Sequence, residues 1–296
     1  MDAMSDDPLL GLVCAIIEHH GYVAEVVDED QVELRRPDQD APGRLYLTNL
    51  RQWAAREPRD QWPAIAADFV GSVIATAESS GDDALDLGDY AMVRPLLRTR
   101  LYGDDFGSGA QALRRPVAPG LVEVLVVDKP TAMMIVNTDL PGKWGMAADE
   151  LFAVAEENVR RDGPLELVDD DYGGVRLFSL GGDYAYATAH ALWAGDYPVT
   201  GPYGALVVVP AQGVVHAVPV HGEEVVAAMN LLVRIGWGGF RQGPRSITPN
   251  VYWWRDGALR LAGAVEVGEA GDAGEDSLAV SISGEFQELL EELVRE

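Results

Sequence analysis

Five arginines are close together in one part of this acidic chain, and their type and spacing are the first sign of chemistry. They are Arg94, Arg98, Arg100, Arg114 and Arg115. Guanidinium groups hold carboxylates and phosphates through paired hydrogen bonds, so a small anionic ligand is one prediction, with Arg94, Arg98, Arg100 and Arg176 as its candidate residues. The alternative, which we favour, is pairing with neighbouring acids such as Asp104 and Asp105.

Three consecutive aspartates, Asp169, Asp170 and Asp171, could supply oxygen ligands to Mg²⁺ or Ca²⁺ together with Asp183. Adjacent carboxylates point in different directions, and the spacing is not that of an EF-hand loop. We therefore interpret the trio as a solvated turn between two strands. A metal-dependent hydrolase or transferase would instead require convergence in one pocket of at least three of Asp128, Asp169, Asp171, Asp183, Arg98 and Arg176.

An aromatic group surrounds residues 246–250, and it is the candidate surface for a protein partner. Its members are Trp237, Phe240, Tyr252, Trp253 and Trp254. Strand periodicity places Tyr252 and Trp254 on one face and Trp253 on the other. Either one face is core and the other is an exposed anchor, or both faces are core between stacked layers, which we favour slightly.

The common catalytic signatures are missing from the sequence. It has no GxxxxGK[ST] or GxGxxG phosphate loop after a strand, and no GxSxG nucleophile elbow. The five histidines have no metal-binding spacing, and the single cysteine, Cys14, excludes an intramolecular disulfide and a cysteine-based zinc site. We predict no metal and no cofactor, and the sequence leans away from an enzyme.

The charge balance restricts the partners. Acidic residues outnumber basic ones 48 to 22, and the net charge of −26 is spread along the chain. This charge repels phosphates, so we expect neither nucleic-acid binding nor docking on an anionic membrane, while a basic protein stays available as a partner. The other explanation, which we favour, is solubility in a salty or crowded cytoplasm or the arginine-rich habit of a GC-rich genome.

Hydropathy and the charge of the first residues predict the cellular location. The chain is 48% hydrophobic, enough for a folded core. No apolar stretch approaches the roughly 18 residues that span a bilayer, and the first residues are acidic where a secretory leader would be basic. We expect a cytoplasmic protein.

Hydrophobic periodicity predicts an α+β fold, in which an N-terminal unit of a helix, three strands and helices precedes repeated β-hairpin-plus-helix modules. The predicted segments are the N-terminal α+β unit (1–80), a linker with the arginine-rich segment (81–115), the hairpin-helix domain (116–262), an acidic glycine-rich linker (263–276), and a C-terminal strand and helix (277–296).

Several local patterns support this organisation. Asp256 and Gly257 are typical of a tight hairpin turn. Residues 184–193 and 223–235 are predicted helices, and the glycines at 236–239 are interpreted as the end of the second one. Asn49 is a predicted N-cap of the helix at 50–56.

The order of segments resembles the bacterial domain-of-unknown-function family 1444 over about residues 10–262. The matching stretches are RLYLTNLRQW (44–53), VRPLLRTRLY (93–102), a hairpin and helix ending in DELFAVAEENVRR (149–161), DYGGVRLFSL (171–180), GALVVVPAQG (204–213) and PRSITPNVYWWRDGALRL (244–261). The family is uncharacterised, so the resemblance implies an architecture and no reaction.

The resemblance also marks polar positions that match its pattern, namely Asn49, Arg98, Asn158, Arg176 and Asn250. In one turn the family tends to carry a histidine and an aspartate, whereas this chain has Ala211 and Gly213. Any chemistry at that turn would be absent here.

Taken together, these patterns favour a non-enzymatic protein-binding module: an adaptor, a chaperone-like protein or an immunity-type inhibitor. The alternatives are the metal-dependent hydrolase or transferase, and a small anionic ligand binder that uses the segment from Arg94 to Arg100.

Overall fold

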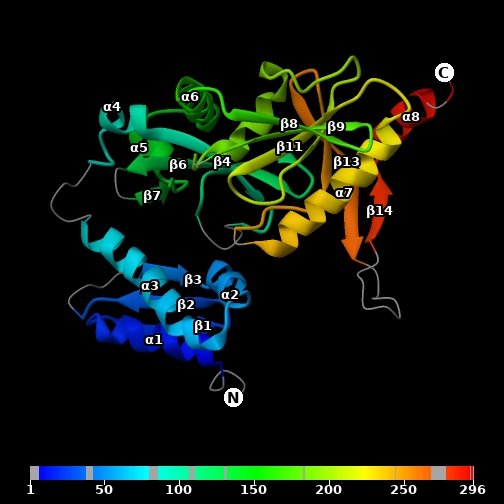
Figure 1. The fold of residues 1–296 in the computed structure, drawn as a ribbon. Coiled ribbons are helices and arrows are strands. Elements are labelled where there is room, and N and C mark those ends of the chain that lie inside the picture. Colours follow the sequence, from blue (N-terminus) through cyan, green and yellow to red (C-terminus); the bar gives the residue numbers. More distant parts are fainter. Residues whose placement is uncertain are drawn as a thin grey trace. The chain divides into compact units, whose positions relative to one another are not determined.

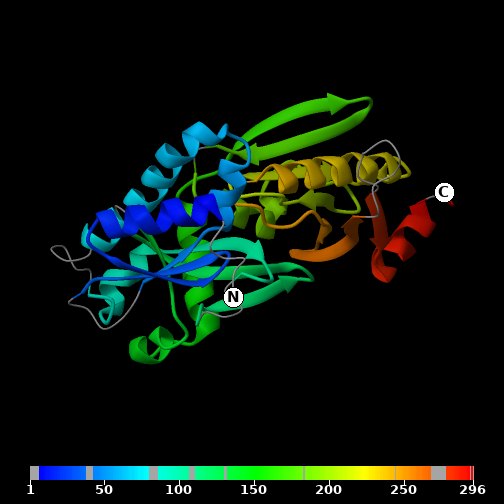
Figure 2. The same cartoon turned by 90° about the horizontal axis from the view of Figure 1, so that it is seen from below.

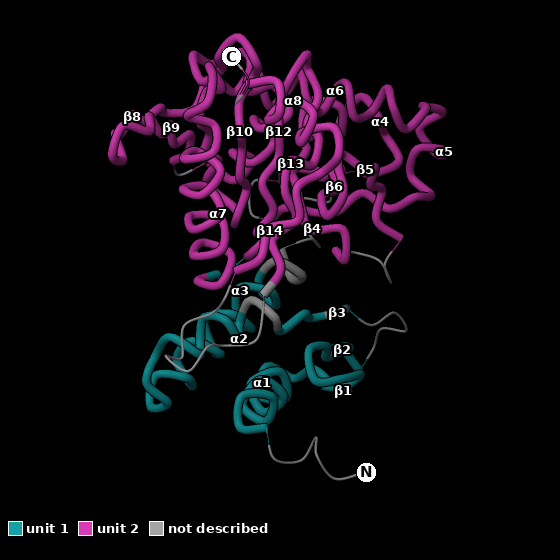
Figure 3. Tube along the Cα trace, turned by 90° about the vertical axis from the view of Figure 1, so that its right-hand side faces the viewer, with its two compact units in different colours: residues 1–84, 243–245 teal, residues 85–242, 246–296 magenta. Residues whose placement is uncertain are grey.

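The computed structural model describes residues 7–37, 43–79, 86–106, 111–129, 132–182, 184–243, 245–267, 278–293 and 295. Helices make up 39% and strands 35% of the structure, so the predicted α+β class is confirmed. The chain divides into two compact units (Figure 3), which are residues 1–84 with 243–245, and residues 85–242 with 246–296.

Unit 1 is a three-stranded antiparallel sheet with helices packed on it (Figure 1). Its elements are α1 (Pro8–His19), β1 (Val23–Asp28), β2 (Gln31–Arg35), β3 (Gly43–Tyr46), α2 (Thr48–Ala54), the 3-10 helix η2 (Arg59–Gln61) and α3 (Trp62–Ser79). Asp7 caps α1 by accepting hydrogen bonds from the amides of Leu9 and Leu10. Helix α2 begins at Thr48, so the predicted cap Asn49 lies inside the helix instead.

The described residues of unit 2 form two antiparallel sheets. The larger has seven strands in the order β14-β13-β12-β10-β11-β9-β8, and in the smaller β6 pairs with β4, β5 and β7. The strands are β4 (Leu97–Gly103), β5 (Arg114–Ala118), β6 (Leu121–Lys129), β7 (Ala132–Ile135), β8 (Glu166–Tyr172), β9 (Val175–Gly181), β10 (Ala205–Val208), β11 (Val214–Pro219), β12 (Val251–Arg255), β13 (Ala258–Val267) and β14 (Leu278–Ile282).

Most helices of unit 2 cover the outer faces of these two sheets, whereas one 3-10 helix lies between the sheets. They are α4 (Tyr90–Val93), η3 (Arg94–Leu96), α5 (Leu140–Trp144), α6 (Ala148–Arg161), the 3-10 helix η4 (Ala187–Asp196), α7 (Val225–Gln242) and α8 (Gly284–Leu293). One core packs the seven-stranded sheet against α7 and α8, and another packs the four-stranded sheet against α5 and α6. The third core lies between the two sheets and includes η4. Unit 2 is therefore a four-layered structure.

Helix α7 corrects the prediction that glycines 236–239 end the helix, because it continues to Gln242. A Cβ at Gly236 would lie 2.9 Å from the carbonyl oxygen of Pro249, and one at Gly239 would lie 2.9 Å from Cβ of Pro210. These glycines allow neighbouring chain to approach the helix closely, and they do not terminate it.

The turn predicted at Asp169–Asp171 is also wrong. All three aspartates lie on β8, and the turn follows at Gly173 and Gly174, whose φ angles are 65° and 91°. A two-residue hairpin turn with positive φ at both positions favours glycine, which adopts this backbone at no steric cost, so Gly173–Gly174 forms the turn more readily than two consecutive aspartates. Asp256 and Gly257, with φ of 52° and 77°, form the predicted turn between β12 and β13.

Two further segments differ from the sequence-based prediction. The helix expected at 184–193 is the 3-10 helix Ala187–Asp196, with non-helical backbone at Trp193. Strand β13 continues to Val267, inside the expected linker 263–276, and residues 268–277 lie outside the described part. Within the described residues, no helix is both long and apolar enough to cross a membrane.

Substituting alanine at Gly204 tests the close packing inside unit 2. A Cβ there would lie 2.2 Å from the carbonyl oxygen of Trp254, whereas Gly213, with a similar positive φ, has nothing within 4 Å of that position. We expect G213A to lower the free energy of unfolding by about 1–2 kcal/mol through backbone strain alone. G204A should lose about 1–3 kcal/mol more through overpacking. Urea unfolding measures both, and equal losses would contradict this packing.

Candidate functional site

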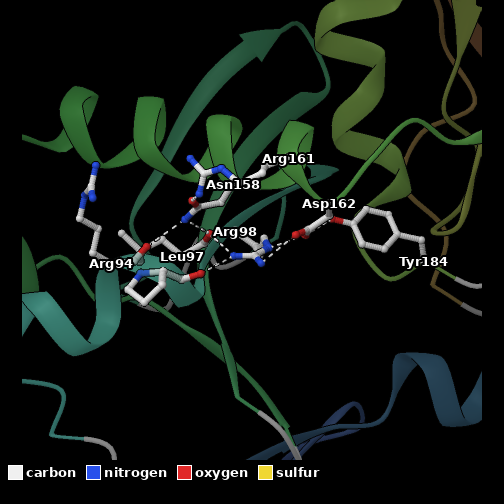
Figure 4. A network of polar contacts seen from close by, with 8 residues as sticks. Arg94, Leu97, Arg98, Asn158, Arg161, Asp162 and Tyr184 are labelled. Carbon is white, nitrogen blue, oxygen red and sulfur yellow. Dashed lines mark hydrogen bonds and ion pairs between the residues drawn. The ribbon is translucent and has the colours of Figure 1, made fainter.

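Arg98 is engaged in a bidentate ion pair within unit 2 (Figure 4). Its Nε and Nη2 lie 2.7 and 3.0 Å from the carboxylate oxygens of Asp162, just after α6. Nη1 donates to the backbone oxygens of Pro95 and Leu97. Although burial opposes the charge, the hydrogen bonds and charge of Asp162 raise the pKa of Arg98 above its ordinary value. The guanidinium is thus occupied by its own chain.

The same network joins three elements around the C-terminal end of α6. Nδ2 of the buried Asn158 donates to the backbone oxygens of Arg94 and Leu97 at 2.9 and 3.0 Å. The hydroxyl of Tyr184 donates to Asp162 at 2.5 Å (Figure 4). These bonds satisfy carbonyls at the start of β4, so Asn158 positions this strand against α6.

The other clustered arginines differ in their surroundings. Arg115 binds Glu123 at 2.6 Å and Glu156, Arg114 donates to the backbone oxygens of Asp104 and Phe106, and the buried Arg100 contacts Gln212 at 3.2 Å. Arg94 has an exposed side chain. Most of the arginines proposed for an anion are therefore engaged inside the protein, although Arg114 uses the carbonyl of Asp104 and not its carboxylate.

The carboxylates proposed for a metal lie on different elements. Asp169, Asp171 and Arg176 belong to the β8–β9 hairpin, whereas Asp128 and Arg98 lie on the four-stranded sheet, and Asp183 is outside the described residues. Among the residues that the structure describes, no group of three or more His, Cys, Asp or Glu could hold a metal ion. Asp169, Asp171 and Arg176 do share one hairpin, but all three are exposed on it and not gathered in a pocket, so these described residues do not show the convergence that the hydrolase hypothesis requires.

The aromatic candidates on β12 are core residues on both faces. Tyr252 is fully buried between the two sheets, and Trp253 is 4% exposed under α8, where its ring packs against Phe286. Trp254, partly buried, donates from Nε1 to the backbone oxygen of Leu192 at 3.0 Å. They are not an exposed anchor, and the second of the two interpretations holds.

Trp237 and Phe240 lie near the end of α7. They are half-buried, and their ring centroids are 6.0 Å apart in a stacked arrangement. A role of these two rings in partner binding stays a prediction.

The β8–β9 hairpin is the candidate functional site, because it extends beyond the rest of its sheet (Figures 2 and 3). Strand β11 pairs with β9 only from Phe178 to Gly181, whereas β8 pairs with β9 along Val175–Gly181. The part nearer the turn is thus a two-stranded ribbon. Val168 and Tyr172 on β8 are 53% and 51% exposed, among the highest exposed fractions of the large apolar side chains in the described residues.

Most of the charge on this hairpin is negative. Glu166, Asp170 and Asp171 are exposed on β8. Asp169 pairs with Arg176 of β9, and the hydrogen bonds from that guanidinium hold the pKa of Asp169 below its ordinary value. The hairpin therefore offers carboxylates and apolar side chains along one outer strand.

A buried histidine was missed by sequence reasoning. His190, 2% exposed, lies on η4, with Nδ1 2.6 Å from the hydroxyl of Tyr197 and 3.2 Å from Nε1 of Trp193. Because the indole N–H can only donate, Nδ1 is the acceptor and the neutral ring carries its proton on Nε2. Burial lowers the pKa of His190 to about 4. A lone histidine in an alanine-rich run carries no sequence signal of this environment.

Comparisons with known proteins identify no relative of this chain. No family model matches it, and no curated protein or solved structure does either. The resemblance to family 1444 therefore stays a prediction from the sequence.

We expect His190 to make stability depend on pH. Its pKa of about 4 in the folded protein lies below the ordinary value of 6.5, so the unfolded chain binds more protons between these values. Stability is complete above pH 6.5 and falls as the pH approaches 4, by about 3 kcal/mol at most. H190Q, which retains an acceptor, should lose this part of the pH dependence. Urea unfolding of both proteins at pH 7 and 4.5 measures it, and parallel losses would contradict the assignment.

Arg98 should behave as a structural residue and not as an anion-binding one. R98M removes the bidentate pair with Asp162, and we expect the free energy of unfolding to fall by about 2 kcal/mol. Inorganic phosphate should raise the melting temperature of the wild type and of R98M equally or not at all. A phosphate-dependent stabilisation that R98M abolishes would restore the anion-binding hypothesis.

Proposed function

We propose that this protein is a non-enzymatic module that binds a basic protein, with the β8–β9 hairpin as its docking element. One observation carries the proposal: an outer strand, extending beyond its sheet, combines exposed carboxylates with exposed Val168 and Tyr172. Apolar contacts in the middle of a charged surface are typical of protein interfaces. An adaptor, a chaperone-like protein and an immunity-type inhibitor all need such a surface.

The charge of the whole chain supports the same partner. A net charge of −26 accelerates the approach of a basic protein and repels acidic ones. At physiological ionic strength the Debye length is about 8 Å, so only charges close to the contact add much to affinity. Glu166, Asp170 and Asp171 are therefore the residues on which binding should depend.

The small-anion alternative has less support. Arg98 and Arg176 are paired with Asp162 and Asp169, and Arg100 is buried against Gln212. A ligand would have to displace these internal partners, which lowers its net affinity. The side chain of Arg94 is exposed to solvent, where a single ion pair with an anion adds little affinity.

The test neutralises the hairpin without disturbing its fold. E166Q/D170N/D171N retains the Asp169–Arg176 pair, and the amide oxygen of Asn at 171 can still accept the hydrogen bond from the N–H of Gly174. The matched control is E223Q/E288Q/E292Q, which removes the same charge from exposed positions outside the hairpin. Wild type and both variants are immobilised, incubated with host lysate at low salt and eluted with a salt gradient.

We expect one basic protein, identified by mass spectrometry, on the wild type and the control. Its Kd for the hairpin variant should rise about tenfold or more, and the wild-type Kd should rise with salt. Recovery indistinguishable from empty beads, or equal affinity of the two variants, would overturn the proposal.

A further inference from the structure

We infer that the partner docks by adding an extended segment as a new strand to the open edge of β8. This inference rests on the proposed function and specifies its mode of binding. β8 is the terminal strand of the seven-stranded sheet, and among the strands that the structure describes it pairs with β9 alone. An edge strand directs backbone N–H and C=O groups away from its neighbour, and an extended peptide can satisfy them by hydrogen bonding.

The edge is long enough to define a register. Seven residues of β8, from Glu166 to Tyr172, pair continuously with β9. Every strand pairing in this sheet is antiparallel, so an added antiparallel strand would continue its pattern.

The register divides the side chains of β8 between two faces. Val168, Asp170 and Tyr172 share one face, because their direct partners on β9 are Ser179, Leu177 and Val175. On the opposite face, Asp169 and Asp171 are paired with Phe178 and Arg176. Any added strand would place its own side chains beside these, in direct cross-strand pairs.

The apolar positions on β8 continue a buried surface. Val175 and Leu177 are buried in the core that packs against α7, whereas Val168 and Tyr172 on the same face of the hairpin stay exposed. An apolar side chain on an added strand would cover Val168 or Tyr172 and extend that core by one strand. This continuity distinguishes the edge from one that is only protected by charge.

These pairs predict the sequence of the occupant. Its residues opposite Val168 and Tyr172 should be apolar, and those opposite Asp170 and Asp171 should be lysine or arginine. The position opposite Asp169 is open, because Arg176 already neutralises this carboxylate. An antiparallel occupant meets Tyr172 first and Val168 last. From its N-terminal to its C-terminal end, its five residues should therefore be apolar, basic, basic, any residue and apolar.

The charge also selects against a second copy of this chain. Two β8 edges brought together would place carboxylates opposite carboxylates, which destabilises the pairing. A basic segment turns the same charges into attraction. The acidic edge thus prevents self-association and accepts the proposed partner.

The experiment uses the full chain and a synthetic nine-residue peptide whose central five residues are valine, arginine, arginine, threonine and valine. The matched control peptide has the same composition with its two valines moved to adjacent central positions. Titration calorimetry at low salt gives both Kd values. We expect the patterned peptide to bind at least tenfold more tightly than the control, and similar Kd values would overturn the inference.

Proline substitutions then test strand addition directly. In an antiparallel strand alternate N–H groups face the neighbour and the open edge, so proline is tolerated at edge-facing positions and blocks an added strand there. We introduce single prolines at Val168, Asp169, Asp170 and Asp171. The two variants whose N–H faces the open edge, either V168P and D170P or D169P and D171P, should retain the wild-type melting temperature. Their Kd for the peptide should rise at least tenfold. D170N and D171N control for the charge that a proline at either position removes.

The outcomes separate this inference from the proposed function. If the peptide binds E166Q/D170N/D171N as tightly as the wild type, the acidic hairpin is not the docking element and the proposed function fails. If that variant binds the peptide weakly, but the proline variants with an unchanged melting temperature bind it as tightly as D170N or D171N, only strand addition is overturned. A peptide-free dimer that those prolines dissociate would overturn the choice of occupant.

Discussion

The apolar core between the two sheets of unit 2 is the constraint on which the other features depend. Side chains from β4, β6, β9, β10, β11 and β12 meet there around η4. A 3-10 helix enclosed by two sheets must have its polar groups satisfied, and the contacts of His190 with Tyr197 and Trp193 do so in part. Arg98 and Asn158, which sequence analysis marked as possible site residues, form hydrogen bonds within the protein beside this core and thus have structural roles.

The arginines show how the fold uses scarce positive charge. With 22 basic against 48 acidic residues, each guanidinium has many carboxylates available. Arg98 joins β4 to the end of α6, and Arg115 joins β5 to Glu123 on β6 and Glu156 on α6. These partly buried pairs use much of the positive charge inside unit 2, and β8 is left with exposed carboxylates.

Sequence patterns identified features that depend on neighbouring residues. The β12–β13 turn at Asp256–Gly257 was predictable because its backbone requires positive φ, and the two faces of β12 followed from alternation. The errors arose where packing overrides local preference. Gly236 and Gly239 resemble a helix end, yet they accommodate Pro249 and Pro210 against a continuing helix. The aspartate trio resembles a turn, yet Gly173–Gly174 adopts the required φ angles more easily.

The sequence by itself determined the charge, the α+β class and the types of most elements, because these depend on composition and on short-range periodicity. Tertiary structure decided which groups are exposed, because exposure depends on what distant segments place against each face. Alternation assigns Trp253 and Tyr252 to opposite faces, but only the packing of α8 and of the second sheet makes both of them core. Likewise, β8 is an edge only because the strand order ends there.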